Sequence, residues 1–253
     1  MSVALYEFPL CEKVRNYLRL EHLFARLHEA KSATTENQHL YFLEVLFNML
    51  ELLERLDLRT DFLRDIDGHE RKLEHWSKHP DIDTEALENA LQSLRSLSAE
   101  IKKNKKLGAN LREEKFLSAI RQRFAIPGGV TSFDVPMLFC WLKQPEQVKQ
   151  NNMSQWLTQL QLIETTMQTL MSFLREKGRF HETQGVNGYY QSSQVSSDEK
   201  LELVRVRCDN ADGFYPVLSG SRNRFGIKFM QLNTETGTST PVTQIVSFAI
   251  ASC

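Results

Sequence analysis

Few residues in this sequence have the types and spacing that catalysis or metal binding requires. His75 and His79 lie four positions apart, but the run HWSKH lacks the glutamate of the zinc motif HExxH, and Pro80 ends the helix there. Glu113 and Glu114 are adjacent, so their carboxylates point in different directions on a helix. The run GGVTS lacks the lysine of a phosphate-binding loop. We therefore expect no enzyme, and no catalytic, cofactor or metal site.

The most distinctive chemistry is a row of basic side chains on the first predicted helix, residues 11–27. Placed on a helix, Arg15, Arg19, His22 and Arg26 fall within a sector about 60° wide, and apolar residues cover most of the remaining circumference. Like charges at this spacing repel each other. Two interpretations stay open. The arginines pair with acidic residues of a neighbouring helix, or the row forms the wall of a groove that receives an acidic partner.

Further basic residues could extend such a groove. Arg112 and Lys115 lie near one outward line of a later predicted helix. A strand over residues 221–230 would place Arg222, Arg224 and Lys228 on one face and its apolar residues on the other, although an ordinary half-solvated strand has the same pattern. If these groups met where two domains join, they would line an interdomain cleft, which is a common place for a binding site.

Hydrophobic periodicity divides the chain into a helical part and a β-rich part. Apolar residues recur at helical spacing as far as Gly178, after which β-branched and aromatic runs take over. Helices are expected at residues 11–27, 37–56, 60–79, 84–101, 110–124, 136–142 and 156–177. Strands are expected at residues 188–194, 201–208, 224–232 and 242–251. A short strand at 3–8 has no neighbour nearby in the sequence and could pair with these.

The sequence thus predicts an α+β fold. An N-terminal all-helical domain (10–178) is followed by a C-terminal antiparallel β-domain (179–253), and the N-terminal strand (1–9) joins the β-domain. A chain of 253 residues with 41% hydrophobic residues is long enough to bury a substantial core.

Composition narrows the classes of partner and compartment. The chain has 31 lysines and arginines against 32 acidic residues, so its net charge of −1 argues against non-specific coating of nucleic acid. It has neither the pattern of a secretory signal nor a run of about 18 apolar residues, so we expect no membrane association. Cys11, Cys140, Cys208 and Cys253 are scattered, which favours reduced thiols in the cytoplasm.

Several blocks of the sequence together resemble the ZapD family, FtsZ-associated cell-division proteins of Gram-negative bacteria. The blocks are CEKVRNYLRLEHLF, RQRFAIPGGVTSFDVP with the following WL, NGYYQ, and YPVLSGSRNRFGIKFM, and they span nearly the whole chain in the family's order. The resemblance implies a cytoplasmic, non-enzymatic homodimer without a cofactor. It would bind the C-terminal tail of FtsZ and cross-link FtsZ filaments at the mid-cell division ring.

The resemblance also selects candidate binding residues. By the family pattern, partner binding is expected at Arg15, Arg19, Arg55, Lys115, Arg224 and Lys228, to which the basic rows add His22, Arg26, Arg112 and Arg222. A tail with acidic and apolar residues would be bound by arginine side chains in a groove with a few apolar contacts. The alternative function is a nucleic-acid-binding regulator that uses the same basic surface, but no recognition helix is apparent.

Overall fold

A computed structural model of the protein describes residues 3–76, 83–192, 201–210 and 213–253. The chain forms two compact units, each defined by contacts within itself. Unit 1 consists of residues 1–18 and 171–253, and unit 2 consists of residues 19–170. The unit boundaries fall inside α1 (Glu12–Ala30) and α8 (Glu146–Lys177).

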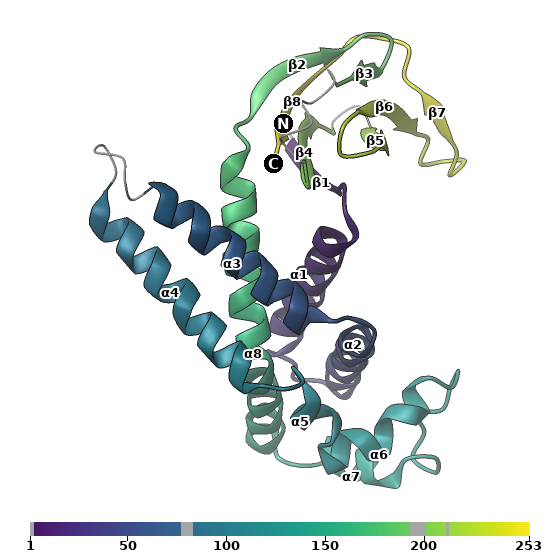
Figure 1. Ribbon diagram of the computed structural model, residues 1–253. Coiled ribbons are helices and arrows are strands. Elements are labelled where there is room, and N and C mark those ends of the chain that lie inside the picture. The colour runs from purple at the N-terminus through teal and green to yellow at the C-terminus, as the bar shows by residue number, and fades with distance from the viewer. Residues whose placement is uncertain (1–2, 77–82, 193–200, 211–212) are drawn as a thin grey trace. The chain divides into compact units, whose positions relative to one another are not determined.

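Unit 2 is helical. Besides most of α1 and α8, it contains α2 (Glu36–Arg55), α3 (Leu58–Trp76), α4 (Thr84–Lys103), α5 (Ala109–Arg112), α6 (Lys115–Phe124) and α7 (Pro136–Leu142). A capping box begins α2, because the Thr35 side chain accepts from the Gln38 backbone and the Gln38 side chain accepts from the Thr35 backbone. Figure 1 shows α3 and α4 lying side by side as a helical hairpin.

The core of unit 2 lies along α2 and α8. One face of α2 is buried from Phe42 to Leu53, and α8 contributes residues at spacings of three and four from Met153 to Leu170. Aromatic rings close the end of this core: the Trp156 ring centroid lies 5.9 Å from that of Trp141 and 6.0 Å from that of Phe116. Burial of large rings makes this end of the unit a strong contributor to stability.

Three of the differences between the predicted helices and the structure have a clear local basis or are large. Residues 110–124 form two helices, because Glu114 acts as the N-cap of α6 by accepting a hydrogen bond from the Leu117 backbone. The helix expected from Trp156 begins at Glu146. The helix expected from Thr60 begins at Leu58, where the Asp57 carboxylate accepts from the Thr60 backbone amide at 3.3 Å.

Unit 1 contains two antiparallel sheets. Sheet A has the order β1 (Val3–Pro9), β4 (Leu203–Asp209), β8 (Val246–Ser252) and β2 (His181–Gly185). Sheet B has the order β3 (Tyr189–Gln191), β6 (Phe225–Leu232) and β5 (Phe214–Gly220), and β7 (Ser239–Pro241) also pairs with β6. The two sheets share one apolar core, in which the rings of Phe229 in sheet B and Phe248 in sheet A lie 5.0 Å apart.

The α+β fold is confirmed, and so is the pairing of the N-terminal strand with the later strands. β1 pairs with β4 in a register that runs from Val3 opposite Asp209 to Pro9 opposite Leu203. The expected domain boundaries at residues 9 and 178 remain a prediction. All four cysteines are free; Cys140 is exposed and the other three are buried.

Candidate functional site

The basic row on α1 is on the exposed side of the helix. Arg15, Arg19 and His22 are exposed and Arg26 is half-buried. The opposite side of the helix is buried through Val14, Tyr17, Leu20, Phe24 and Leu27. Arg15 belongs to unit 1, and the other three belong to unit 2. The sequence pattern therefore identified correctly which side of α1 faces solvent.

Two arginines of this row have partners that the sequence did not indicate. Arg15 makes an ion pair with Glu12 on its own helix. Arg26 donates from Nε to the Tyr41 hydroxyl at 2.8 Å, and its guanidinium carbon lies 5.1 Å from the centre of the Tyr41 ring. For these two residues the structure shows no acidic partner on a neighbouring helix within the described ranges. The Tyr41 ring holds the Arg26 guanidinium in one orientation.

Arg55 and Arg112 line one pocket of unit 2, with a volume of about 720 Å³ between α2 and α6. Arg55 makes an ion pair with Glu51, and Arg112 donates to the Leu107 carbonyl at 3.2 Å. The pocket also carries Glu44, Glu54 and Arg121. Acidic and basic side chains are thus equal in number, and the pocket has no surplus of positive charge among its described residues.

An ion pair between Arg121 and Glu54 lies on the wall of this pocket. Both guanidinium nitrogens of Arg121 donate to the Glu54 carboxylate, at 2.6 and 3.0 Å. This hydrogen bonding, aided by the nearby positive charges, lowers the pKa of Glu54 below its ordinary value. Glu54 therefore stays ionised at neutral pH and keeps Arg121 occupied.

A second, adjoining pocket of about 530 Å³ shares Glu44, Phe124 and Ala125 with the first. Its walls are Leu40 and Tyr41 of α2 and the loop 126–130, so the Tyr41 ring that stacks on Arg26 also lines this pocket. Gly129 has to be glycine, because a Cβ atom there would lie 2.7 Å from the Arg123 carbonyl oxygen. The structure therefore places Arg55 and Arg112 in one pocket of unit 2, and Arg26 against Tyr41, which lines the adjoining pocket. The glycine-rich loop was the sequence signal of this adjoining pocket.

Lys115 is the first residue of α6 and is exposed, outside the residues that line the two pockets. Its side chain makes no hydrogen bond or ion pair with the residues that the structure describes.

In unit 1, the basic residues near β6 divide into two groups. β6 begins at Phe225, so Lys228 lies on the strand while Arg222 and Arg224 lie in the preceding turn, where the Ser221 amide donates to the Arg224 carbonyl at 2.8 Å. The expectation of one continuous strand carrying all three is therefore wrong. The apolar residues Phe225, Ile227 and Phe229 are buried as predicted.

The outer face of sheet B carries an aromatic side chain beside Lys228. Lys228 pairs with Tyr189 on β3 and with Val217 on β5, and the side chains of all three are exposed. The Tyr189 ring covers Gly226, where an added Cβ would lie 2.5 Å from the Tyr189 hydroxyl oxygen. The space that the sequence suggested on the basic side of Gly226 is thus filled by tyrosine.

The three cations of this region differ in how far they are neutralised. Burial raises the pKa of Glu202, but Lys13, Lys177 and Arg222 outweigh it and lower this pKa overall. Arg222 therefore interacts electrostatically with Glu202, an acidic residue of its own unit. The side chains of Arg224 and Lys228 are exposed and make no hydrogen bond or ion pair within the described part of the chain.

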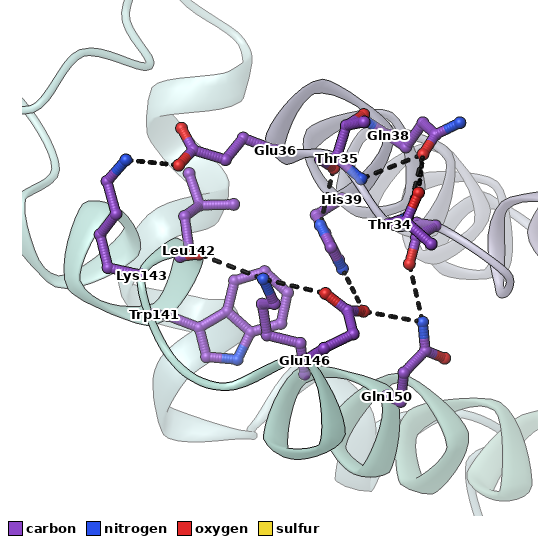
Figure 2. A network of polar contacts seen from close by, with 12 residues as sticks. Thr34, Thr35, Glu36, Gln38, His39, Trp141, Leu142, Lys143, Glu146 and Gln150 are labelled. Atoms are coloured by element: carbon purple, nitrogen blue, oxygen red, sulfur yellow. Dashed lines mark hydrogen bonds and ion pairs between the residues drawn. The ribbon is translucent and has the colours of Figure 1, made fainter.

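A polar network that sequence reasoning missed supports the start of α2 (Figure 2). The His39 side chain is fully buried, and its Nδ1 lies 2.7 Å from the Thr35 carbonyl oxygen. Its Nε2 lies 3.1 Å from Glu146 Oε1. The Glu146 carboxylate also accepts from Lys149 at 3.2 Å and from Gln150 at 3.0 Å. A TxxQ capping box beside a histidine in an apolar run was the available signal.

This network joins α2, α7 and α8. Lys149 donates to the Leu142 carbonyl at 3.2 Å, and Gln150 donates to the Ala33 carbonyl at 2.8 Å. Burial raises the pKa of Glu146, but hydrogen bonds from Gln150, Lys149 and His39 outweigh it and lower this pKa overall. The polar side chains of this network are hydrogen-bonded to one another and to backbone carbonyls, so we assign the network a structural role.

The described part of the chain offers neither a metal-binding cluster nor a membrane-spanning helix. Within residues 3–76, 83–192, 201–210 and 213–253, no group of three or more His, Cys, Asp or Glu side chains is arranged to hold a metal ion. His75 lies in the last turn of α3, and His79 lies outside the described residues. None of the helices in the described ranges combines the length and the apolar character that crossing a bilayer requires.

Comparison with known proteins gives one consistent family. A family model described as ZapD, cell division protein, matches residues 18–228. The cell division protein ZapD of Pectobacterium carotovorum subsp. carotovorum (strain PC1) is 33% identical over 252 residues, which cover 100% of this chain and 98% of that protein. ZapD of Shewanella sp. (strain MR-4) is 35% identical over 253 residues, and ZapD of Photobacterium profundum is also 35% identical; in both cases 100% of each chain is covered.

Proposed function

This chain belongs to the ZapD family of cell division proteins, and from that premise we propose that it is a cytoplasmic adaptor for FtsZ. It binds the C-terminal tail of FtsZ through exposed basic residues. As a homodimer it cross-links and bundles FtsZ filaments at the mid-cell division ring during septation. Its activity is binding alone, without catalysis or a cofactor.

The observation that carries the proposal is a pair of basic side chains on unit 1 that have no acidic partner among the described residues. Arg224 and Lys228 are exposed and have no acidic partner among the described residues, and Lys228 lies beside the exposed Tyr189 and Val217. Acidic side chains of a tail would pair with the two cations, while apolar side chains would contact the tyrosine ring and the valine. Such a mixed surface suits a short acidic and apolar peptide better than a purely charged one.

Unit 2 supports the proposal with a second set of basic residues. Arg19 and His22 are exposed on α1, Arg26 is held over Tyr41 beside an apolar pocket, and Lys115 is exposed at the start of α6. Arg55 and Arg112 are the weaker candidates of this unit, because ionic or hydrogen-bonding partners already occupy them. The convergence of both sets in one cleft stays a prediction.

Cross-linking follows from combining the tail site with a dimer. A dimer offers two tail sites, and an FtsZ filament offers many tails, so modest affinity at one site is enough for stable bridging. The closed symmetry of a dimer also limits each adaptor to joining two filaments at a time.

The primary test is fluorescence anisotropy of a labelled FtsZ C-terminal tail peptide titrated with the protein at two salt concentrations. We expect saturable binding that weakens at higher salt, because exposed charge pairs are screened. Arg224→Glu and Lys228→Glu should each raise Kd by about tenfold, a loss of about 1.4 kcal/mol. Lys72→Glu, which reverses an exposed charge on α3, is the matched control. Unchanged binding by both β6-region variants would reject unit 1 as a tail site.

The second set is tested separately with Arg19→Glu and Lys115→Glu. Reduced tail affinity with an unchanged circular dichroism spectrum would assign both residues to the site. A melted spectrum for Arg19→Glu would show instead that the α1 row is structural. Sedimentation of FtsZ filaments with the protein, together with its mass by analytical ultracentrifugation, tests the bundling dimer. A monomer that sediments no extra FtsZ would refute that part.

The alternative, a nucleic-acid-binding regulator, has less support. The pocket that contains Arg55 and Arg112 also contains Glu44, Glu51 and Glu54, whose carboxylates repel phosphate groups. The chain carries a net charge of −1. A gel shift with random duplex DNA at low salt distinguishes the two functions, since tight duplex binding would favour the regulator.

A further inference from the structure

The outer face of sheet A carries a group of side chains that the proposed tail site does not use. Along β4, Val204, Val206 and Cys208 point into the core, so Arg205 and Arg207 lie on the outer face. The antiparallel register puts Glu7 of β1 opposite Arg205 and Leu5 opposite Arg207. All these residues belong to unit 1.

A single aromatic ring connects the two arginines. The guanidinium carbons of Arg207 and Arg205 lie 4.2 and 5.1 Å from the centre of the Phe180 ring. Phe180 comes directly before β2, on the far side of β8 from β4, and reaches across because β8 has only Ala249 and Ala251 opposite the arginines. Stacking on a ring restricts a guanidinium while leaving its N–H donors free at the edge.

Acidic and basic side chains are equal in number here, with Glu7, Glu182 and Asp209 against Arg175, Arg205 and Arg207, but they are paired unevenly. Arg175 donates to both oxygens of Glu7, at 2.9 and 2.6 Å, and Arg205 donates to the same carboxylate at 2.9 Å. The Glu7 carboxylate therefore accepts hydrogen bonds from two arginines. The side chain of Arg207 is exposed and makes no hydrogen bond or ion pair with the residues that the structure describes. Glu182 of β2 lies in the same row beyond Ala249, and no ion pair joins it to Arg207.

Apolar side chains lie next to the stacked arginine. Leu5 is 47% exposed and Val3 is 58% exposed, and both share the outer face with Arg207. A free phosphate or a nucleic acid backbone would gain nothing from these two side chains. A peptide with a carboxylate next to an aliphatic residue would use both the cation and the apolar surface.

We propose that the outer face of sheet A is a second peptide-binding site, at which Arg207, stacked on Phe180, binds an acidic side chain while Leu5 and Val3 contact the neighbouring apolar residue. The stacked guanidinium of Arg207, which has no carboxylate partner among the described residues, selects an acidic side chain, and the exposed apolar pair selects a peptide. This site shares no residue with the proposed FtsZ tail site and does not depend on that function.

The probe is a short fluorescein-labelled synthetic peptide that alternates aspartate with leucine, compared with a twin that has asparagine at each aspartate. We expect the acidic peptide to bind at least tenfold more tightly than its twin, because a charge-assisted pair between the stacked guanidinium and a carboxylate is stronger than a hydrogen bond to an amide oxygen. Equal binding of the two peptides, or no binding of either, would overturn the proposal.

Variants locate the site. Arg207→Gln should weaken binding of the acidic peptide by about tenfold, and Phe180→Leu by a few fold, because the apolar volume stays while the stacking is lost. Arg179→Gln is the matched control, since it removes an exposed arginine immediately before Phe180. A loss of binding in Arg179→Gln equal to that in Arg207→Gln would show diffuse attraction and reject the site. Thermal unfolding of each variant confirms that it is folded.

Two further measurements separate this site from other interpretations. Binding of the FtsZ tail should be unchanged in Arg207→Gln, so failure of the tail proposal and failure of this one are distinguishable. An unlabelled single-stranded oligonucleotide should not displace the peptide. Complete displacement at equal concentration would show that the face recognises phosphate, and would overturn its assignment to a peptide.

Discussion

His39 shows how one buried polar residue can determine local structure. Its side chain is inaccessible to solvent, and each ring nitrogen lies within hydrogen-bonding distance of an oxygen, one from Thr35 and one from Glu146. A buried polar group is tolerated only when it is paired, so removal of the ring would affect its partners as well as leave a cavity.

We therefore expect His39→Ala to lower the free energy of unfolding by about 2 kcal/mol. Urea unfolding followed by tryptophan fluorescence measures the change, because Trp141 and Trp156 lie in the same unit as His39. Gln147→Ala, which alters an exposed residue of the same turn of α8, should leave stability almost unchanged. Equal stability of both variants would show that the network contributes nothing.

Glu54 gives a prediction about pH. Its pKa is lowered below the ordinary value of 4.5 in the folded protein, chiefly by hydrogen bonding to Arg121. A carboxyl group with a lowered folded-state pKa contributes stability above its unfolded pKa and loses it as the pH falls through the folded pKa. The contribution is thus complete above about pH 5 and declines below about pH 4.5.

We expect Glu54→Gln to reduce the loss of stability between about pH 5 and about pH 3, compared with the unmodified protein. Urea titrations at several pH values in this range measure the slope. Glu88→Gln removes an exposed acid that has no ion pair with the described residues and serves as the control. Parallel slopes for all three proteins would contradict the prediction.

At the residue level, the sequence predicted exposure better than it predicted partners. The helical pattern of α1 correctly placed Arg15, Arg19 and His22 outside. It could not predict that Arg26 stacks on Tyr41 or that Arg112 donates to a carbonyl, because such contacts depend on the packing of other segments. Arg224 and Lys228 are the candidates whose freedom from acidic partners, among the described residues, only the structure could reveal.

At the level of elements, periodicity found the helices and the buried strands but missed three strands. β2 has the polar sequence HETQG, which shows no apolar alternation. β5 contains Pro216, a residue that argues against a strand, and β7 has only three residues. These strands exist because neighbours pair with them, and a single sequence does not display that pairing. The separation of α5 from α6 depended likewise on the cap at Glu114.

Two glycines of unit 1 differ in what an added Cβ atom would meet. At Gly226, an added Cβ would meet the movable hydroxyl end of Tyr189, whereas at Gly188 it would lie 2.2 Å from the Val242 carbonyl oxygen and φ is +66°. The first clash can be relieved by rotating a side chain. The second requires movement of the backbone.

We expect Gly226→Ala to displace Tyr189 and to weaken binding of the FtsZ tail a few fold while the melting temperature hardly changes. Gly188→Ala should lower stability by about 2 kcal/mol, because an L-residue there is both crowded and strained. Thermal unfolding and peptide anisotropy on the same samples separate the two effects. A large drop in melting temperature for Gly226→Ala would show that the tyrosine cannot move.

At the level of the whole molecule, the tryptophans lie in one unit and most of the cysteines lie in the other. All three tryptophans, Trp76, Trp141 and Trp156, lie in unit 2. Three of the four cysteines lie in unit 1 and are buried, while the exposed Cys140 lies in unit 2. Burial raises the pKa of Cys208 to about 11, so its reactive thiolate is scarce at neutral pH.

We expect a thiol reagent to label one cysteine per native chain rapidly and the other three only on unfolding. Absorbance of the released thiolate measures both phases. Cys140→Ser should abolish the fast phase without altering the slow one. A fast phase that persists in this variant would show that unit 1 opens readily in the native state.

The pairing of β1 with β4 has a consequence for synthesis of the protein. Residues 3–9 are translated long before their partner, residues 203–209. Until that partner has been made, residues 3–9 therefore carry unpaired backbone amides and carbonyls together with Val3, Leu5 and Phe8. A prematurely terminated product would keep that exposed strand permanently, and its apolar side chains are the kind of signal that chaperones and proteases bind.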